Sequence, residues 1–158
     1  MKAISLKQPW ANLVANGKKT IETRTWPTKH RGNLLIVSSK RPNTPPAGYA
    51  VAIVRVIDCR PMTIADKNAA CCKIHPKAWA WILEDIRPIT PFPVKGSLGI
   101  CEAALPNSVI ESQLHTTLHR HQKQGYVSYS ARPEKQSLHP GSYSSQQYHN
   151  KQLHERDQ

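Results

Sequence analysis

The stretch Gly17-Lys18-Lys19-Thr20-Ile21-Glu22-Thr23-Arg24 decides how the front of this chain folds, because a helix is predicted to end and a strand to begin within it. The preceding residues, Gln8–Asn16, place apolar side chains at helical spacing after a proline that suits a first helical turn. Gly17 suits the left-handed residue that closes a helix. The sequence therefore predicts a short amphipathic helix that leads directly into a strand.

The predicted strand, Thr20–Trp26, carries charged side chains on one face. Side chains alternate along a strand, so Glu22, Arg24 and Trp26 share a face. Two interpretations remain open at this point. The carboxylate and the guanidinium form either a solvated ion pair, worth ~0–1 kcal/mol, or, together with Lys19, part of a binding site.

Composition favours a single small domain. A chain of 158 residues with 39% hydrophobic residues can bury one modest core. No run of roughly 18 apolar residues and no hydrophobic signal segment is present, which predicts a soluble, cytoplasmic protein without membrane contact.

The four cysteines lack Cys-x-x-Cys spacing and are predicted to be reduced thiols. The adjacent Cys71 and Cys72, with His75, are poorly placed for zinc, so no metal and no cofactor is predicted.

The positive charge is concentrated in the front of the chain. Residues 1–107 hold 16 Lys and Arg against 6 Asp and Glu, which accounts for +10 of the total of +12. Such an excess favours polyanionic partners, because phosphate neutralisation releases counterions and speeds encounter. Nucleic acid is the leading class of partner. The alternative is that the basic residues only keep a small protein soluble.

Alternation and β-branched content predict about six short strands and few helices, which is typical of a small barrel or a mixed α+β domain. A helical turn is predicted within Thr63–Ala70, and Pro88, Pro91 and Pro93 predict an extended connection. Trp79 and Trp81 should face the same way, which favours a place in the core over a base-stacking platform. The predicted strands are Lys2–Leu6, Thr20–Trp26, Gly32–Ser38, Tyr49–Asp58, Ala78–Leu83 and Leu98–Ala104.

The composition changes after Asn107. Residues 108–158 are dense in Ser, Gln and His and show no apolar periodicity, so they are predicted to form a disordered tail behind a domain at 1–107. The tail's His115, His119 and His121 form a loose cluster that is not expected to bind a metal.

Four ordered blocks over residues 1–106 resemble an ASCH domain. The family's hallmark is a G-x-K-x-x-E-x-R pattern, which Gly17, Lys19, Glu22 and Arg24 match here. The blocks are Ile4–Ala11, Gly17–Arg24, Trp26–Gly32, and Trp81–Glu84 followed by Pro93–Gly99.

This resemblance implies a PUA-like β-barrel with a cleft beside the hallmark strand, in a superfamily associated with RNA binding, RNA modification and transcriptional coactivation. It implies that the cleft binds RNA or a nucleotide, with DNA left open, and that phosphate contacts come from Lys19, Arg24 and nearby lysines. Trp10 or Trp26 would stack a base. Three of the expected ligand-binding residues match the family pattern, and the others are expected to line the cleft. The full set is Lys19, Glu22, Arg24, Gln8, Trp10, Trp26, Lys40 and Lys95.

Two alternatives from other classes stay open. Some bacterial relatives hydrolyse an acetylated cytidine amide with a lysine, a threonine and a glutamate, and others are assigned ribonuclease activity. In this chain the threonine position is occupied by Glu22, so an enzyme of this kind would use Lys19 and Glu22 without a metal, on an N4-acylcytidine-type amide or on RNA. The second alternative is a protein-interaction module in transcription, with residues 108–158 as the interaction arm.

Overall fold

The structure, a computed structural model, describes residues 1–114 and contains one six-stranded sheet with the strand order β2-β5-β4-β3-β1-β6. All neighbouring strands are antiparallel except β1 and β3, which are parallel. The strands are β1 (Lys2–Leu6), β2 (Ile21–Arg24), β3 (Gly32–Ser38), β4 (Tyr49–Pro61), β5 (Trp79–Pro93) and β6 (Ile100–Glu102).

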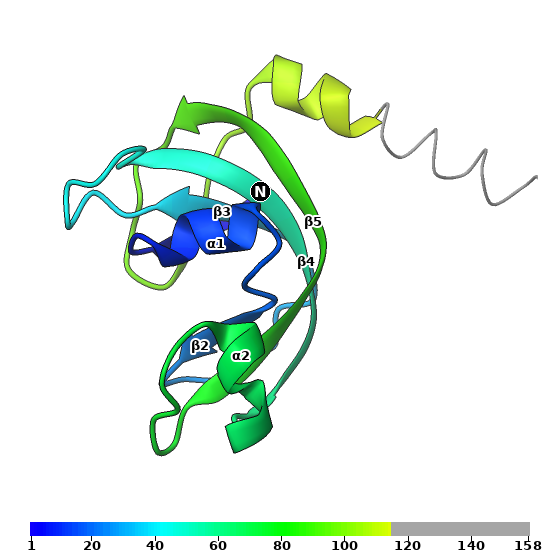
Figure 1. Ribbon diagram of the computed structural model, residues 1–158. Coiled ribbons are helices and arrows are strands. Elements are labelled where there is room, and N and C mark those ends of the chain that lie inside the picture. Colours follow the sequence, from blue (N-terminus) through cyan, green and yellow to red (C-terminus); the bar gives the residue numbers. More distant parts are fainter. Residues whose placement is uncertain (115–158) are drawn as a thin grey trace, which may run out of the picture.

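The sheet curls into a half-barrel, and the short helix α1 (Trp10–Ala15) lies in its concavity (Figure 1). Ala11 and Val14 of α1 are buried against a cluster that includes Leu34, Val54 and Trp81. Two further short elements, η1 (Ile64–Asp66) and α2 (Lys67–Ala70), connect β4 to β5. The predicted fold class, a small PUA-like α+β domain of about six strands with a few short helices, is confirmed.

The predicted alternation along β2 is also confirmed. Glu22 lies opposite Trp81 and Arg24 opposite Trp79 on β5, so these side chains share the concave face. Trp81 is fully buried, which confirms its predicted place in the core. The strand itself is shorter than predicted, since it ends at Arg24.

The prediction of a connection at Pro88, Pro91 and Pro93 is wrong, because β5 continues through all three prolines. The neighbouring strand β2 pairs with β5 only as far as Ile82, whereas β4 pairs with it along its whole length. The second half of β5 is therefore an edge, where a missing backbone N–H breaks no ladder.

The chain after Asn107 also differs in part from its prediction. Residues 107–114 are helical, and Val109 is buried in a second apolar cluster with Leu35, Val37 and Ile53 on the other face of the sheet. Arg87 of β5 donates a hydrogen bond to Gln113. The first turns of the predicted tail thus belong to the fold, and residues 115–158 lie outside the described residues.

Candidate functional site

The end of α1 sets the direction in which the hallmark residues enter the core. Gly17 adopts a left-handed conformation (φ +72°), as predicted. The Gly17 N–H donates to the Val14 carbonyl and the Lys18 N–H to the Leu13 carbonyl, which is the hydrogen-bond pattern of a Schellman motif. The chain therefore turns sharply and the next residue, Lys19, points inward.

Lys19 is one of the most buried side chains in the described structure, with 2% of its surface exposed. Its ammonium donates a hydrogen bond to the Ala70 carbonyl at 2.7 Å. This carbonyl lies at the end of α2, where backbone oxygens have no partner within the helix. The next carbonyl, that of Cys71, accepts a hydrogen bond from the Trp10 indole at 3.2 Å. Two side chains from the front of the chain thus satisfy the end of α2.

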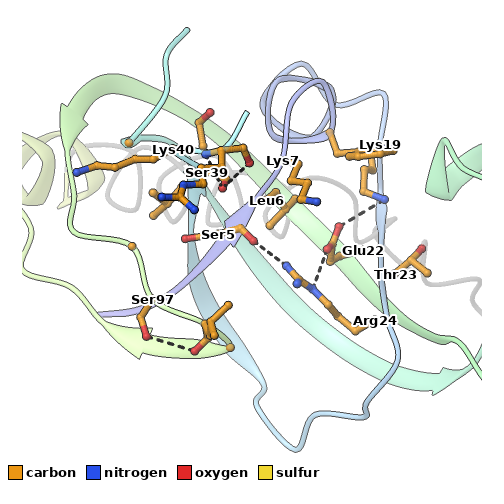
Figure 2. Close-up of a pocket in the computed structure, with 18 of the residues that line it drawn as sticks. Ser5, Leu6, Lys7, Lys19, Glu22, Thr23, Arg24, Ser39, Lys40 and Ser97 are labelled. Atoms are coloured by element: carbon orange, nitrogen blue, oxygen red, sulfur yellow. Dashed lines mark hydrogen bonds and ion pairs between the residues drawn. The ribbon is translucent and has the colours of Figure 1, made fainter. Parts of the chain in front are cut away.

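Glu22 stands between two cations. Its Oε2 lies 3.4 Å from Lys19 Nζ and its Oε1 lies 3.0 Å from Arg24 Nε, and its side chain is 8% exposed (Figure 2). The Arg24 Nε–H is not aligned with that oxygen, so this contact is an ion pair rather than a good hydrogen bond. The interpretation of a solvated surface pair is therefore wrong. We call Lys19, Glu22 and Arg24 the buried cluster.

Arg24 also connects two strands that are not neighbours in the sheet. Its Nη2 donates to the Ser5 carbonyl of β1 at 2.9 Å, although β5, β4 and β3 separate β2 from β1 in the strand order. The hydrogen bond spans the open side of the half-barrel. The buried cluster thus links β2 to both α2 and β1.

A pocket of about 850 Å³ lies over the buried cluster. Among the described residues that line it are six cationic side chains and one carboxylate, Glu22. Four of the cations are exposed: Lys7, after β1; Lys40 and Arg41, after β3; and Lys95, after β5. Within residues 1–114, none of these four forms an ion pair. We call Lys40, Arg41 and Lys95 the rim cluster.

The structure gathers six of the eight predicted site residues in this pocket: Lys19, Glu22, Arg24, Trp10, Lys40 and Lys95. It does not place Gln8 or Trp26 on the pocket wall. The Gln8 amide instead donates to Ser38 Oγ at 3.0 Å. The Trp26 ring packs edge-on against Trp81, with 4.8 Å between the ring centroids.

Sequence reasoning missed Lys7, Arg41 and His75, which also line the pocket. Lys7 and Arg41 closely follow strands, so attention to charged residues at strand ends would have found them. His75 has no comparable signal, because the irregular segment after α2 brings it there.

Thr23 lines the pocket, but its hydroxyl is directed to the other face of β2. It contacts Cys72 Sγ at 3.4 Å and Met62 Sδ at 3.7 Å.

All four cysteines are free thiols, as predicted. Among residues 1–114 no three His, Cys, Asp or Glu side chains are grouped so as to hold a metal ion, and the predicted histidine cluster of the tail lies outside this range. No described helix is long and apolar enough to cross a membrane.

The curled half-barrel is the fold of a class of small domain that has been solved before. The crystal structure of ASCH from Zymomonas mobilis superposes with a TM-score of 0.53 at 16% identity, covering 72% of this chain and 93% of that one. A mutant form of the same Zymomonas mobilis protein gives a TM-score of 0.50 at 16% identity, covering 72% and 96%. At this identity the likeness establishes the fold.

The family follows from the sequence model. The ASCH domain model matches residues 4–93, more than half of the chain, and the chain belongs to the ASCH domain family, whose PUA-like fold is associated with RNA binding.

Two curated relatives each match about a third of this chain. Activating signal cointegrator 1 of Mus musculus is 40% identical over 55 residues, which is 34% of this chain. The Homo sapiens protein of that name is 31% identical over 80 residues and covers 35% of it. The match spans only 10% and 14% of those two proteins.

Proposed function

We propose that this domain binds single-stranded RNA or a nucleotide in the pocket over the buried cluster. The observation that carries the proposal is the charge of the pocket wall, where six cations face one carboxylate. The volume of about 850 Å³ falls in the range of pockets that enclose small organic ligands. A concave basic surface attracts phosphates and concentrates the field between its walls.

The six cations do not serve the ligand equally. Lys19 and Arg24 already donate to the Ala70 and Ser5 carbonyls and share the Glu22 carboxylate. The exposed cations Lys7, Lys40, Arg41 and Lys95 are therefore the ones that contact phosphate, while the buried cluster presents a polar floor to the base or ribose. Trp10, half-buried beside that floor, offers an aromatic edge.

The hydrolase alternative receives less support from the same contacts. A nucleophilic lysine must present its nitrogen to the substrate, and the Lys19 nitrogen already contacts the Ala70 carbonyl and the Glu22 carboxylate. The hydroxyl of Thr23, which lines the pocket on β2, contacts sulfur atoms rather than Glu22. A transcriptional interaction module rests only on the names of relatives that share one short region.

The proposal is tested by fluorescence anisotropy of the full chain with a labelled single-stranded oligoribonucleotide across a salt series. The triple variant Lys40→Ala/Arg41→Ala/Lys95→Ala is compared with Lys29→Ala, which removes an exposed lysine that does not line the pocket. Each lost phosphate contact should reduce the slope of log affinity against log salt by about 0.7.

We expect the triple variant to bind weakly and with a slope lower by about 2, and Lys29→Ala to bind like wild type. The same loss of slope per removed charge in the two variants would show diffuse attraction to a basic surface instead of a pocket. Mass spectrometry of the same RNA and of N4-acetylcytidine after incubation checks the alternative, since turnover abolished by Lys19→Ala would establish a hydrolase.

A further inference from the structure

We propose that the rim cluster forms a dedicated phosphate subsite and that Gly48 is its positioning residue. This inference rests on the proposed function and goes further, because it states which end of the pocket takes the phosphate and which residue organises that end. Figure 2 shows Lys40 and Ser97 at the end of the pocket opposite Lys19 and Thr23. The subsite is therefore separate from the buried cluster.

Gly48 lies directly beneath the Lys40 side chain. It is buried although it belongs to the exposed connection between β3 and β4, and its φ of +79° suits glycine. A Cβ built on Gly48 would lie 2.8 Å from Lys40 Cε and 3.1 Å from Lys40 Cγ. The methylene groups of Lys40 thus rest on bare backbone, which fixes the path of the side chain along the rim.

The backbone of Gly48 also fixes the second lysine of the subsite. Its N–H donates to the Ser38 carbonyl at 2.8 Å, and its carbonyl accepts from the Val94 N–H at 2.9 Å. Val94 immediately precedes Lys95. Gly48 therefore links the segment that carries Lys40 and Arg41 to the segment that carries Lys95.

This arrangement is chemically suited to phosphate. Within residues 1–114 the three cations of the rim cluster have no carboxylate partner, so their charge is available to a ligand. A lysine normally loses rotamer freedom when it binds an anion, and packing the stem on Gly48 removes part of that loss before the ligand arrives. The ammonium is then a pre-positioned point charge for a phosphate oxygen.

The test is Gly48→Ala in the full chain, in wild-type and Lys40→Ala backgrounds, with anisotropy of the labelled oligoribonucleotide as the readout. Gly32→Ala is the matched control, because Gly32 also has a positive φ (+104°) but a Cβ there meets no atom within 4 Å. Both alanines strain the backbone at a positive φ, thermal unfolding measures the cost of each, and only Gly48→Ala displaces Lys40. The flexible end of Lys40 can move aside, so the variant should still fold.

We expect Gly48→Ala to weaken RNA binding several-fold and to lower the salt slope by about 0.7, as Lys40→Ala does, and to have no further effect in the Lys40→Ala background. If wild type binds but Gly48→Ala matches Gly32→Ala, or if its effect is the same in both backgrounds, Gly48 does not position Lys40 and the inference fails while the proposed function stands. Absence of salt-dependent binding by wild type would overturn both.

Discussion

The buried cluster and the rim cluster contain the same kinds of cation in the same pocket, and they differ in what surrounds each charge. Lys19 is 2% exposed and has two protein partners, whereas Lys40 and Lys95 are exposed and have no ion-pair partner among the described residues. A buried charge must be paired to be tolerated, so the hallmark cations stabilise the fold first. Cations whose charge is unpaired and solvated are the ones a phosphate can reach.

Among the variants of the two clusters, Glu22→Gln is expected to cause the largest loss of stability. It leaves the buried Lys19 ammonium without a carboxylate, and removal of one partner of a buried ion pair costs about 3–5 kcal/mol. Urea unfolding of the full chain measures the loss.

The matched control for that variant is Glu84→Gln. Glu84 pairs with Arg55 at 3.3 Å, but both side chains are more than half exposed, so the expected loss is ~0–1 kcal/mol. Similar losses in the two variants would mean that burial does not distinguish the hallmark pair from a surface pair.

Sequence alone predicts where the side chains of the buried cluster lie on their elements, but not which groups they contact. The helix end at Gly17 and the shared face of Glu22 and Arg24 follow from local rules, and both are confirmed. The partners of the cluster could not be predicted, because the Ala70 and Ser5 carbonyls are backbone groups brought in by tertiary packing. A backbone carbonyl that accepts a hydrogen bond from a distant side chain leaves no signal in the sequence.

The errors have physical causes of the same kind. Trp26 was predicted on the site face, but β2 ends at Arg24 and the indole packs on Trp81 instead. The prolines of β5 predict an extended connection in place of a strand, because local rules cannot tell an edge from the middle of a sheet. Val109 is one apolar residue in a polar stretch, so its burial depended on a second face of the sheet that was not foreseen.

The helix α2, which supplies the Ala70 carbonyl to Lys19, has Asp66 as its N-cap residue. Asp66 precedes α2, receives two hydrogen bonds from Arg60 and others from the Thr63 N–H and hydroxyl, and is 5% exposed. Asp66→Asn should therefore destabilise the fold by about 1–3 kcal/mol. Its RNA salt slope should remain that of wild type, because Asp66 does not line the pocket.

The pH dependence of this loss has a definite sign. Hydrogen bonds from Arg60, and then from Thr63, hold the pKa of Asp66 well below its ordinary value, although burial opposes the shift. Its stabilisation is therefore complete above the unfolded-state value of about 3.9 and is lost as the pH falls below that toward the folded pKa. Unfolding free energies of wild type and Asp66→Asn should converge below about pH 4, and a constant difference would contradict the assignment.

The smallest expected change in stability, and the sharpest separation of the two clusters, comes from Lys95→Gln. The side chain is exposed and has no ion-pair partner within residues 1–114, so the free energy of unfolding should change by less than about 0.5 kcal/mol. The salt slope of RNA binding should nevertheless fall by about 0.7, because one phosphate contact is lost. Urea unfolding and anisotropy on the same preparation measure both quantities. A variant that loses stability and keeps its salt slope would place Lys95 with the structural cations, since a charge that holds the fold together is not available to the ligand.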